Sequence, residues 1–164
     1  MHDPSLPAAP VDGVRYALAP MTAERADAVA RWRYPPPYER YGAPEAADGR
    51  FRAVLRDGAL CGFVQWFPLA AEDGGAVVRL GLGMRPDLCG RGEGAAFVRF
   101  LAEETARLHP GAAIDLEVAA GNVRAVRAYE RAGFRVEDAY ELPLRGGGVE
   151  PVVNMVWAGG EPER

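Results

Sequence analysis

Residues 84–100 read MRPDLCGRGEGAAFVRF, and the rest of the predicted fold is arranged around them. The apolar run from Val77 to Leu82 before them predicts a strand, and the apolar spacing from Ala95 onward predicts a helix. Three glycines between residues 90 and 94 join the two elements. Because glycine has no Cβ, this loop can adopt positive φ and approach a ligand closely. Its exposed amides, together with the positive end of the following helix, predict a site for a phosphate or pyrophosphate.

The composition narrows the classes of function. The chain has 164 residues, of which 49% are apolar, and a formal net charge of −4. We expect a single domain over residues 13–158 between a flexible N-terminal tail at 1–12 and a C-terminal tail at 159–164. The acidic balance argues against nucleic acid or an anionic membrane as the main partner. All nineteen basic residues are arginine, which excludes a Walker-type phosphate loop and a lysine Schiff base.

Other reactive residues are scarce. The single serine, Ser5, lies in a Pro-rich segment, which makes a serine hydrolase very unlikely. Cys61 and Cys89, with His2 and His109, show no metal-ligand spacing, so no metal is expected. The N-terminus does not resemble a signal segment and no apolar run is long enough to cross a membrane, so we expect a cytoplasmic protein.

The spacing of apolar residues and turn residues predicts an α+β domain. Its mixed, mostly antiparallel sheet of about seven strands should have helices on both faces. The hairpin around Asp57 and Gly58 is the clearest turn, because these residues accept positive φ. Helices are expected from Thr22 until the triple proline at 35–37, and from Asn122 to Ala132. The expected strands are 14–18, 51–56, 59–69, one ending near 84, 113–119, 134–144 and 149–157.

The glycine loop also fits part of the dinucleotide-binding fingerprint. Gly90, Gly92 and Ala95 match G-x-G-x-x-A, and Asp115 follows somewhat over twenty residues later. The fit is poor, because residues 85–89 separate the loop from its strand and the preceding strands read as antiparallel. A nicotinamide dinucleotide oxidoreductase is therefore the weaker alternative.

A second motif follows the strand at 113–119. It reads N-x-x-A-x-x-x-Y-x-x-x-G-F and consists of Asn122, Ala125, Tyr129, Gly133 and Phe134. Together with the glycine loop about thirty residues earlier, this motif resembles the GNAT superfamily of acyl-CoA-dependent N-acetyltransferases. The resemblance extends over roughly residues 75–140.

The loop resembles the Q/R-x-x-G-x-G/A motif of that superfamily, with Cys89 in the first place, followed by Gly92 and Gly94. The resemblance implies that acetyl-CoA is the acyl donor. The backbone of Leu82, Gly83 and Met84 would pair with pantetheine, and could also stabilise the oxyanion. The loop amides would bind the pyrophosphate, with Arg91 and Arg85 as possible additional charges. The implied cofactor residues of the loop and second motif are Cys89, Gly90, Arg91, Gly92, Glu93, Gly94, Ala95, Asn122, Ala125 and Tyr129.

The resemblance also implies catalytic roles. Tyr129 would be the general acid that protonates the departing thiolate. Asn122 would cap its helix and could also bond pantetheine. The family often carries an acid on the fourth strand, where this chain has Arg79. Glu117, which shares one face of its strand with Asp115, is the best candidate for the general base. Glu72, Asp73 and a water chain are the alternatives.

Aromatic residues on both sides of the triple proline are candidates for the acceptor site. The predicted set is Trp32, Tyr34, Tyr38, Tyr41 and Trp66, accompanied by the acids Glu39, Glu45 and Asp48. Aromatic faces and carboxylates would hold a cationic amine. The alternative is that these rings form a small core that packs the loop onto the sheet.

The sequence thus predicts an enzyme that moves an acetyl group from acetyl-CoA to a primary amine by direct attack in a ternary complex. The acceptor would be a small molecule or a peptide. A catalytically degenerate acyl-CoA-binding module is the alternative, because the fourth-strand acid is missing and Cys89 departs from the motif. The C-terminal hairpin could form the edge of a homodimer.

Overall fold

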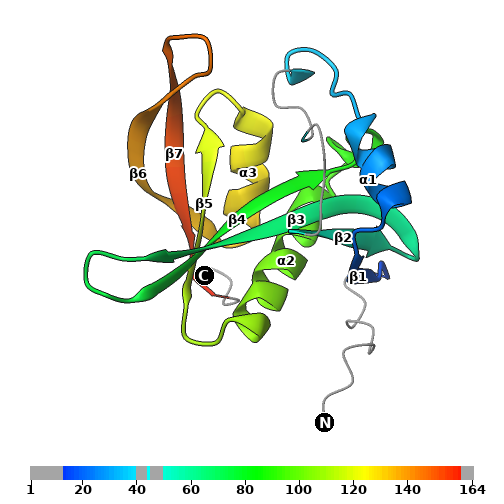
Figure 1. Ribbon diagram of the computed structural model, residues 1–164, viewed down its shortest axis with the longest axis horizontal. Coiled ribbons are helices and arrows are strands. Elements are labelled where there is room, and N and C mark those ends of the chain that lie inside the picture. Colours follow the sequence, from blue (N-terminus) through cyan, green and yellow to red (C-terminus); the bar gives the residue numbers. More distant parts are fainter. Residues whose placement is uncertain (1–12, 40–43, 45–49, 160–164) are drawn as a thin grey trace. The chain divides into compact units, whose positions relative to one another are not determined.

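The computed structural model describes residues 13–39, 44 and 50–159, so both predicted tails lie outside them except for Gly159. Seven strands form one sheet in the order β1-β2-β3-β4-β5-β7-β6 (Figure 1). The elements are β1 Tyr16–Pro20, α1 Ala23–Ala30, β2 Phe51–Arg56, β3 Ala59–Ala70, β4 Ala76–Met84, the 3-10 turn η2 Pro86–Leu88, α2 Gly94–Leu108, β5 Ala113–Ala119, α3 Val123–Arg131, β6 Phe134–Pro143 and β7 Val149–Trp157. The sheet is mixed, because β4 pairs with β5 in parallel while β1-β2, β2-β3, β5-β7 and β6-β7 are antiparallel. The predicted α+β fold class is therefore confirmed.

The chain divides into two compact units. The first comprises residues 1–65 and 82–89, and the second comprises residues 66–81 and 90–164. Strands β3 and β4 each contribute residues to both units. The single domain expected over residues 13–158 stays a prediction.

The core of the first unit explains why the first helix ends earlier than predicted. Thr22 caps α1 as expected, its side chain accepting the Arg25 N–H. The helix ends at Ala30, before the triple proline, and Trp32 lies beyond it. The Trp32 ring instead packs against the cluster of Val29, Phe51 and Phe63, with its centroid 6.2 Å from that of Phe63. The packing of the Trp32 ring therefore replaces the helical turn that was predicted after Ala30.

Gly83, in the first unit, is fixed by the same cluster. A Cβ at this position would lie 2.4 Å from the ring of Phe63, a distance at which the ring would have to move. Phe63 is itself buried against Phe51, with the ring centroids 5.7 Å apart. The need for glycine at residue 83 is therefore a packing requirement, independent of any ligand.

The second unit is built on α2 and the C-terminal strands. Strand β7 lies between β5 and β6 (Figure 1). Val98, Leu101 and Thr105, which lie at helical spacing on α2, are buried, whereas Leu108, which continues this spacing, is 44% exposed. The buried face thus ends one turn before the helix does. Phe97, Phe100 and Ala102 are buried as well.

The strands β4 and β5 pair over a short length. Their register joins Val77 to Ala113, Val78 to Ile114 and Arg79 to Asp115. Beyond that last pair β4 continues to Met84 and β5 to Ala119. On β5, Ile114, Leu116 and Val118 are buried, and Asp115 and Glu117 belong to the opposite face because strand side chains alternate. Glu117 therefore stands two residues past the final pair.

Candidate active site

The glycine loop of the second unit combines two different uses of glycine. Gly90 and Gly92 have φ values of +77° and +81°, in the region that other residues rarely adopt. Both are exposed, and a Cβ at Gly92 would meet nothing within 4 Å. Gly94 is the first residue of α2, and a Cβ there would lie 3.2 Å from the Cβ of Ala128 on α3. The sequence predicted one conformational role for all three, but Gly94 serves the close approach of two helices.

A positively charged side chain lies beside the glycine loop. An ideal Cβ at Gly90 would lie 3.7 Å from Nη1 of Arg124, which places this guanidinium beside the loop. Sequence analysis did not single out Arg124. Its position as the second residue of α3, two residues after the motif asparagine, was the available signal. Loop amides, a helix N-terminus and a guanidinium all favour an anion.

The second motif folds as its residues predict. The Asn122 side chain caps α3 by accepting the Ala125 N–H at 3.4 Å, and Gly133 follows the helix with φ +104°. Tyr129 is half-buried on α3, with its ring centroid 6.2 Å from that of Phe134. The motif therefore fixes the orientation of one helix, and its glycine also lets Trp157 approach to 3.2 Å from an ideal Cβ at residue 133.

The segment before the loop, in the first unit, is held by backbone and side-chain bonds. The Tyr34 hydroxyl donates to the Met84 carbonyl at 2.7 Å. Nη1 of Arg85 donates to the Leu60 carbonyl at 2.8 Å, and its Nε lies 2.6 Å from a carboxylate oxygen of Asp87. Arg85, offered above as a possible charge for the pyrophosphate, is thus engaged within its own unit. The pairing of residues 82–84 with pantetheine stays a prediction.

The aromatic residues predicted for the acceptor site have structural contacts of their own. Trp32 packs against the apolar cluster of the first unit. This contact fits the alternative in which the rings form a small core. Trp66, in the second unit, donates its indole N–H to the hydroxyl of Thr105 at 2.9 Å. Tyr38 is half-buried. Tyr41, Glu45 and Asp48 lie outside the described residues. The acceptor role of this set stays a prediction.

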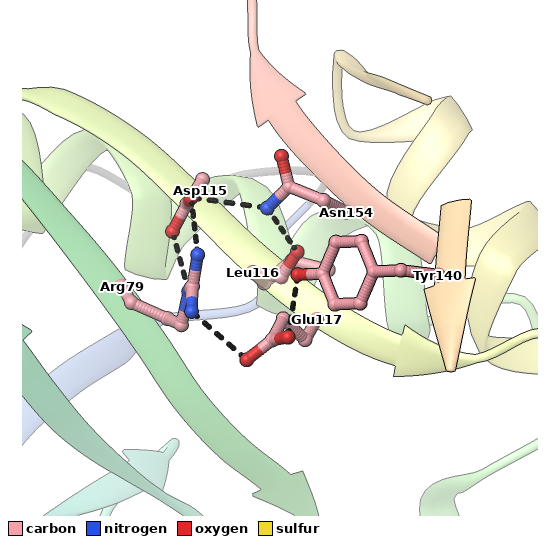
Figure 2. A network of polar contacts seen from close by, with 6 residues as sticks. All are labelled: Arg79, Asp115, Leu116, Glu117, Tyr140 and Asn154. Carbon is pink, nitrogen blue, oxygen red and sulfur yellow. Dashed lines mark hydrogen bonds and ion pairs between the residues drawn. The ribbon is translucent and has the colours of Figure 1, made fainter. Parts of the chain in front are cut away.

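Polar side chains from four strands meet on one face of the second unit (Figure 2). Arg79 of β4 makes a two-pronged bond to Asp115 of β5, at 3.0 Å for each oxygen, and reaches Glu117 at 2.9 Å. The Tyr140 hydroxyl of β6 donates to the other oxygen of Glu117 at 2.5 Å. The Asn154 amide of β7 donates to Asp115 at 3.0 Å. We call these five residues the β-face network.

Three members of the β-face network can be singled out from the sequence: Glu117 as base candidate, Asp115 as its strand neighbour and Arg79 in place of an acid. Tyr140 and Asn154 are not among the predicted residues. The available signal was Asn154 itself, a polar residue inside the apolar run VVNMVW at 152–157, because such a residue usually has a specific partner.

The network shifts the ionisation of two members. The hydrogen bonds to Asp115 raise the pKa of the Arg79 guanidinium above its ordinary value, so it stays charged. Burial, and then the bond to Glu117 and its negative charge, raise the pKa of Tyr140 to about 12. At neutral pH Tyr140 is therefore a donor to Glu117.

We expect the phenol of Tyr140 to ionise near pH 12, against 10.0 for an ordinary tyrosine. Because the pKa is raised in the folded state, its contribution to the free energy of unfolding is present below pH 10 and is lost as the pH rises toward 12. Phenolate absorbance of the wild type minus that of Tyr140→Phe measures this ionisation directly. A difference curve with its midpoint near pH 10 would contradict the assignment.

Comparison with known proteins identifies the family. The model of the "Acetyltransferase (GNAT) family" matches residues 19–134, well over half of the chain. The chain therefore belongs to the GNAT acetyltransferase family, as its two motifs indicated. No curated relative matches the sequence.

Solved structures share the fold at low sequence identity. A chimera of spermidine N-acetyltransferase SpeG from Vibrio cholerae and hSSAT has 18% identity and a TM-score of 0.63, over 87% of this chain and 94% of that one. AAC(6')-Ib in complex with ribostamycin and coenzyme A has 22% identity and a TM-score of 0.62, over 87% and 92%. Arabidopsis thaliana NAA60 in complex with acetyl-CoA has 16% identity and a TM-score of 0.61, over 87% and 97%. At these identities the likeness establishes the fold alone.

No helix within residues 13–39 and 50–159 is long and apolar enough to cross a membrane. The same part of the chain has no group of three or more His, Cys, Asp or Glu side chains placed to hold a metal ion.

Proposed function

We propose that this protein transfers an acetyl group from acetyl-CoA to a primary amine by direct attack in a ternary complex. The observation that carries the proposal is the exposed glycine loop at the N-terminus of α2 in a chain of the GNAT acetyltransferase family. Similar folds hold acetyl-CoA and coenzyme A, and one of them belongs to a spermidine N-acetyltransferase chimera. The geometry of the glycine loop and the family both support acetyl-CoA as the acyl donor.

In this proposal the loop binds the diphosphate of the donor. Residues 90–92 are exposed and lead into the start of α2 at Gly94, where the helix dipole favours negative charge, so the amides from Gly90 to Ala95 would bind the diphosphate. Arg91 is exposed on the same loop and adds positive charge. Asn122 caps α3, Ala125 lies in the first turn of α3, and both would contact the pantetheine arm.

The proposed chemistry needs a general base and a general acid. Glu117 takes a proton from the acceptor ammonium, which frees the nitrogen lone pair for attack on the thioester carbonyl carbon. As the carbon–sulfur bond breaks, Tyr129 gives its phenolic proton to the sulfur. The nitrogen loses a second proton as the amide forms, and this proton restores the phenol of Tyr129. Glu117 releases the first proton to solvent, so the products are the acetylated amine, free coenzyme A and one proton, and atoms and charge balance.

The acceptor is proposed as a cationic small molecule or a peptide amine. One of the similar folds carries ribostamycin and another is named for spermidine. Both names fit an acceptor that bears an amine. The cytoplasmic location and the homodimer stay predictions of the sequence.

The direct test uses the full chain, acetyl-CoA and a broad panel of primary amines, with free thiol and product mass as readouts. We expect amine-dependent release of coenzyme A and a product heavier by one acetyl group. Acetyl-CoA should also raise the melting temperature, because it binds the folded state. Thermal stabilisation without turnover would favour the acyl-CoA-binding module. Neither effect with any amine would refute the enzyme.

Replacing Gly92 by valine tests the loop itself. Since φ at residue 92 is +81° and nothing crowds the position, the change acts through the backbone and not through a clash. A non-glycine residue disfavours this conformation by about 1–2 kcal/mol, and as the loop relaxes we expect acetyl-CoA to bind about tenfold more weakly. Isothermal calorimetry measures the change.

Gly146→Val is the matched control for Gly92→Val. Gly146 has φ +90° in the turn between β6 and β7 and equally open surroundings. This variant carries the same backbone cost away from the proposed site, so it should lower stability and leave acetyl-CoA affinity unchanged. Equal weakening by both variants would mean that affinity follows general stability.

A further inference from the structure

Both carboxylate oxygens of Glu117 are held by neighbouring side chains. Nη1 of Arg79 lies 2.9 Å from Oε1, and the Tyr140 hydroxyl lies 2.5 Å from Oε2. Figure 2 shows the two donors reaching Glu117 from different strands, β4 and β6, on either side of its own strand β5. Two directed bonds therefore restrict the orientation of this carboxylate.

We propose that Arg79 and Tyr140 are positioning residues that hold the Glu117 carboxylate in the orientation in which it receives the proton of the acceptor amine. This inference rests on the proposed function. It assigns to Arg79, which stands where the family often has an acid, the task of orienting an acid on the next strand. It assigns to Tyr140 a role that differs from that of Tyr129.

The rest of the network anchors the two positioning residues. Asp115 fixes Arg79 through the two-pronged bond, a geometry that suits the planar guanidinium. Asn154 donates to Asp115 at 3.0 Å and to the Leu116 carbonyl at 3.2 Å. Arg79 and Asp115 also face each other in the last paired position of β4 and β5, so their ion pair lies where the pairing of these strands ends.

The carboxylates of Asp115, which anchors Arg79, and Glu117, the proposed base, differ in exposure. The Asp115 side chain is 10% exposed and that of Glu117 is 23% exposed. A carboxylate has about four lone-pair positions, and the bonds described above use two of those on Glu117. Glu117 therefore keeps acceptor capacity and is the more exposed of the two carboxylates.

The charges of the network favour an ammonium group. One guanidinium stands between two carboxylates, so the cluster as a whole carries one excess negative charge. Arg79 also makes two bonds to Asp115, so its position does not depend on Glu117 alone. Orientation matters because misplacing a catalytic group by about 1 Å can cost about 100-fold in rate.

A double-mutant cycle tests whether Tyr140 acts through Glu117. In the otherwise wild-type protein, Tyr140→Phe should lower kcat about fivefold to tenfold and leave the KM for acetyl-CoA unchanged. In the Glu117→Gln background, the same change should have less than about a twofold effect, because the oriented group is already lost. Arg79→Lys, which keeps the charge but loses the fork, should give the same pattern.

Several results would overturn the proposal. One is an undiminished kcat in Tyr140→Phe. Another is an equal loss of kcat from Tyr140→Phe in the wild-type and Glu117→Gln backgrounds, as expected if Tyr140 only stabilises the sheet. Should either variant fail to fold by circular dichroism, the cycle with the other decides. Glu141→Gln, an exposed neighbour of Tyr140 on β6, is the control for surface changes. Full activity of Glu117→Gln would refute the positioning role and leave acetyl transfer standing, whereas an inactive wild type would refute the proposed function.

Discussion

Replacing Tyr129 by phenylalanine is expected to lower kcat for acetyl transfer by about 100-fold to 1,000-fold, the range that loss of a general acid typically produces. The change removes only the hydroxyl. The ring keeps its place at 6.2 Å from that of Phe134, so α3 and its cap should remain intact. Steady-state kinetics with saturating amine measure kcat, and calorimetry measures the affinity for acetyl-CoA.

The effect should fall on kcat and spare binding. An interaction made only in the transition state lowers kcat and kcat/KM together, so we expect nearly unchanged affinity for acetyl-CoA. With acetyl donors that have a more acidic thiol, the loss of kcat in Tyr129→Phe should be smaller, because a better leaving group needs less help from an acid. Glu130→Gln, exposed at the next position of α3, is the matched control. A Tyr129→Phe enzyme of wild-type kcat would remove Tyr129 from the mechanism.

Glu117→Gln is expected to lower kcat/KM for an alkylamine by about 100-fold at neutral pH, the lower end for loss of a general base. The carboxamide keeps the shape of the side chain but cannot take up a proton. An ordinary alkylamine is almost wholly protonated at neutral pH, so the enzyme must remove a proton before attack. Rates across a pH series measure the loss.

The choice of acceptor distinguishes a base from a structural residue. With an amine that is mostly neutral at the assay pH, the deficit of Glu117→Gln should shrink several-fold, because no ammonium proton has to be removed. An equal deficit with both kinds of amine would point to a structural role. Glu72→Gln and Asp73→Asn separate the remaining candidates, since both acids are exposed in the turn between β3 and β4. A large loss in either, with Glu117→Gln active, would move the base to that turn.

Local chemistry made much of the fold predictable. Thr22 and Asn122 cap their helices with their own side chains, and Gly133 ends α3 at positive φ. Asp57 and Gly58 both adopt positive φ in the predicted hairpin. Each of these features depends on residues within about four positions of one another, so the sequence pattern contains the cause. The end of α1 differs from the prediction because Trp32 packs against residues distant in sequence and does not continue the helix.

The candidate site divides in the same way. The glycine loop and the Asn122–Phe134 motif could be read from spacing, and with them the family. The β-face network could not, because its bonds join residues 36 positions apart for Arg79 and Asp115 and 23 apart for Glu117 and Tyr140. A register slip by one residue in any strand would turn these side chains to the opposite face.

The sequence by itself determined the α+β class, the glycine loop, the two helix caps and the membership of the GNAT family, because these follow from the conformational needs of neighbouring residues. Only the tertiary structure decided that Gly83 and Gly94 serve close packing, that Trp66 bonds to Thr105, and that Glu117 is held from two sides. The physical reason is that pairing register and side-chain packing bring distant residues together, and no local preference encodes which ones meet.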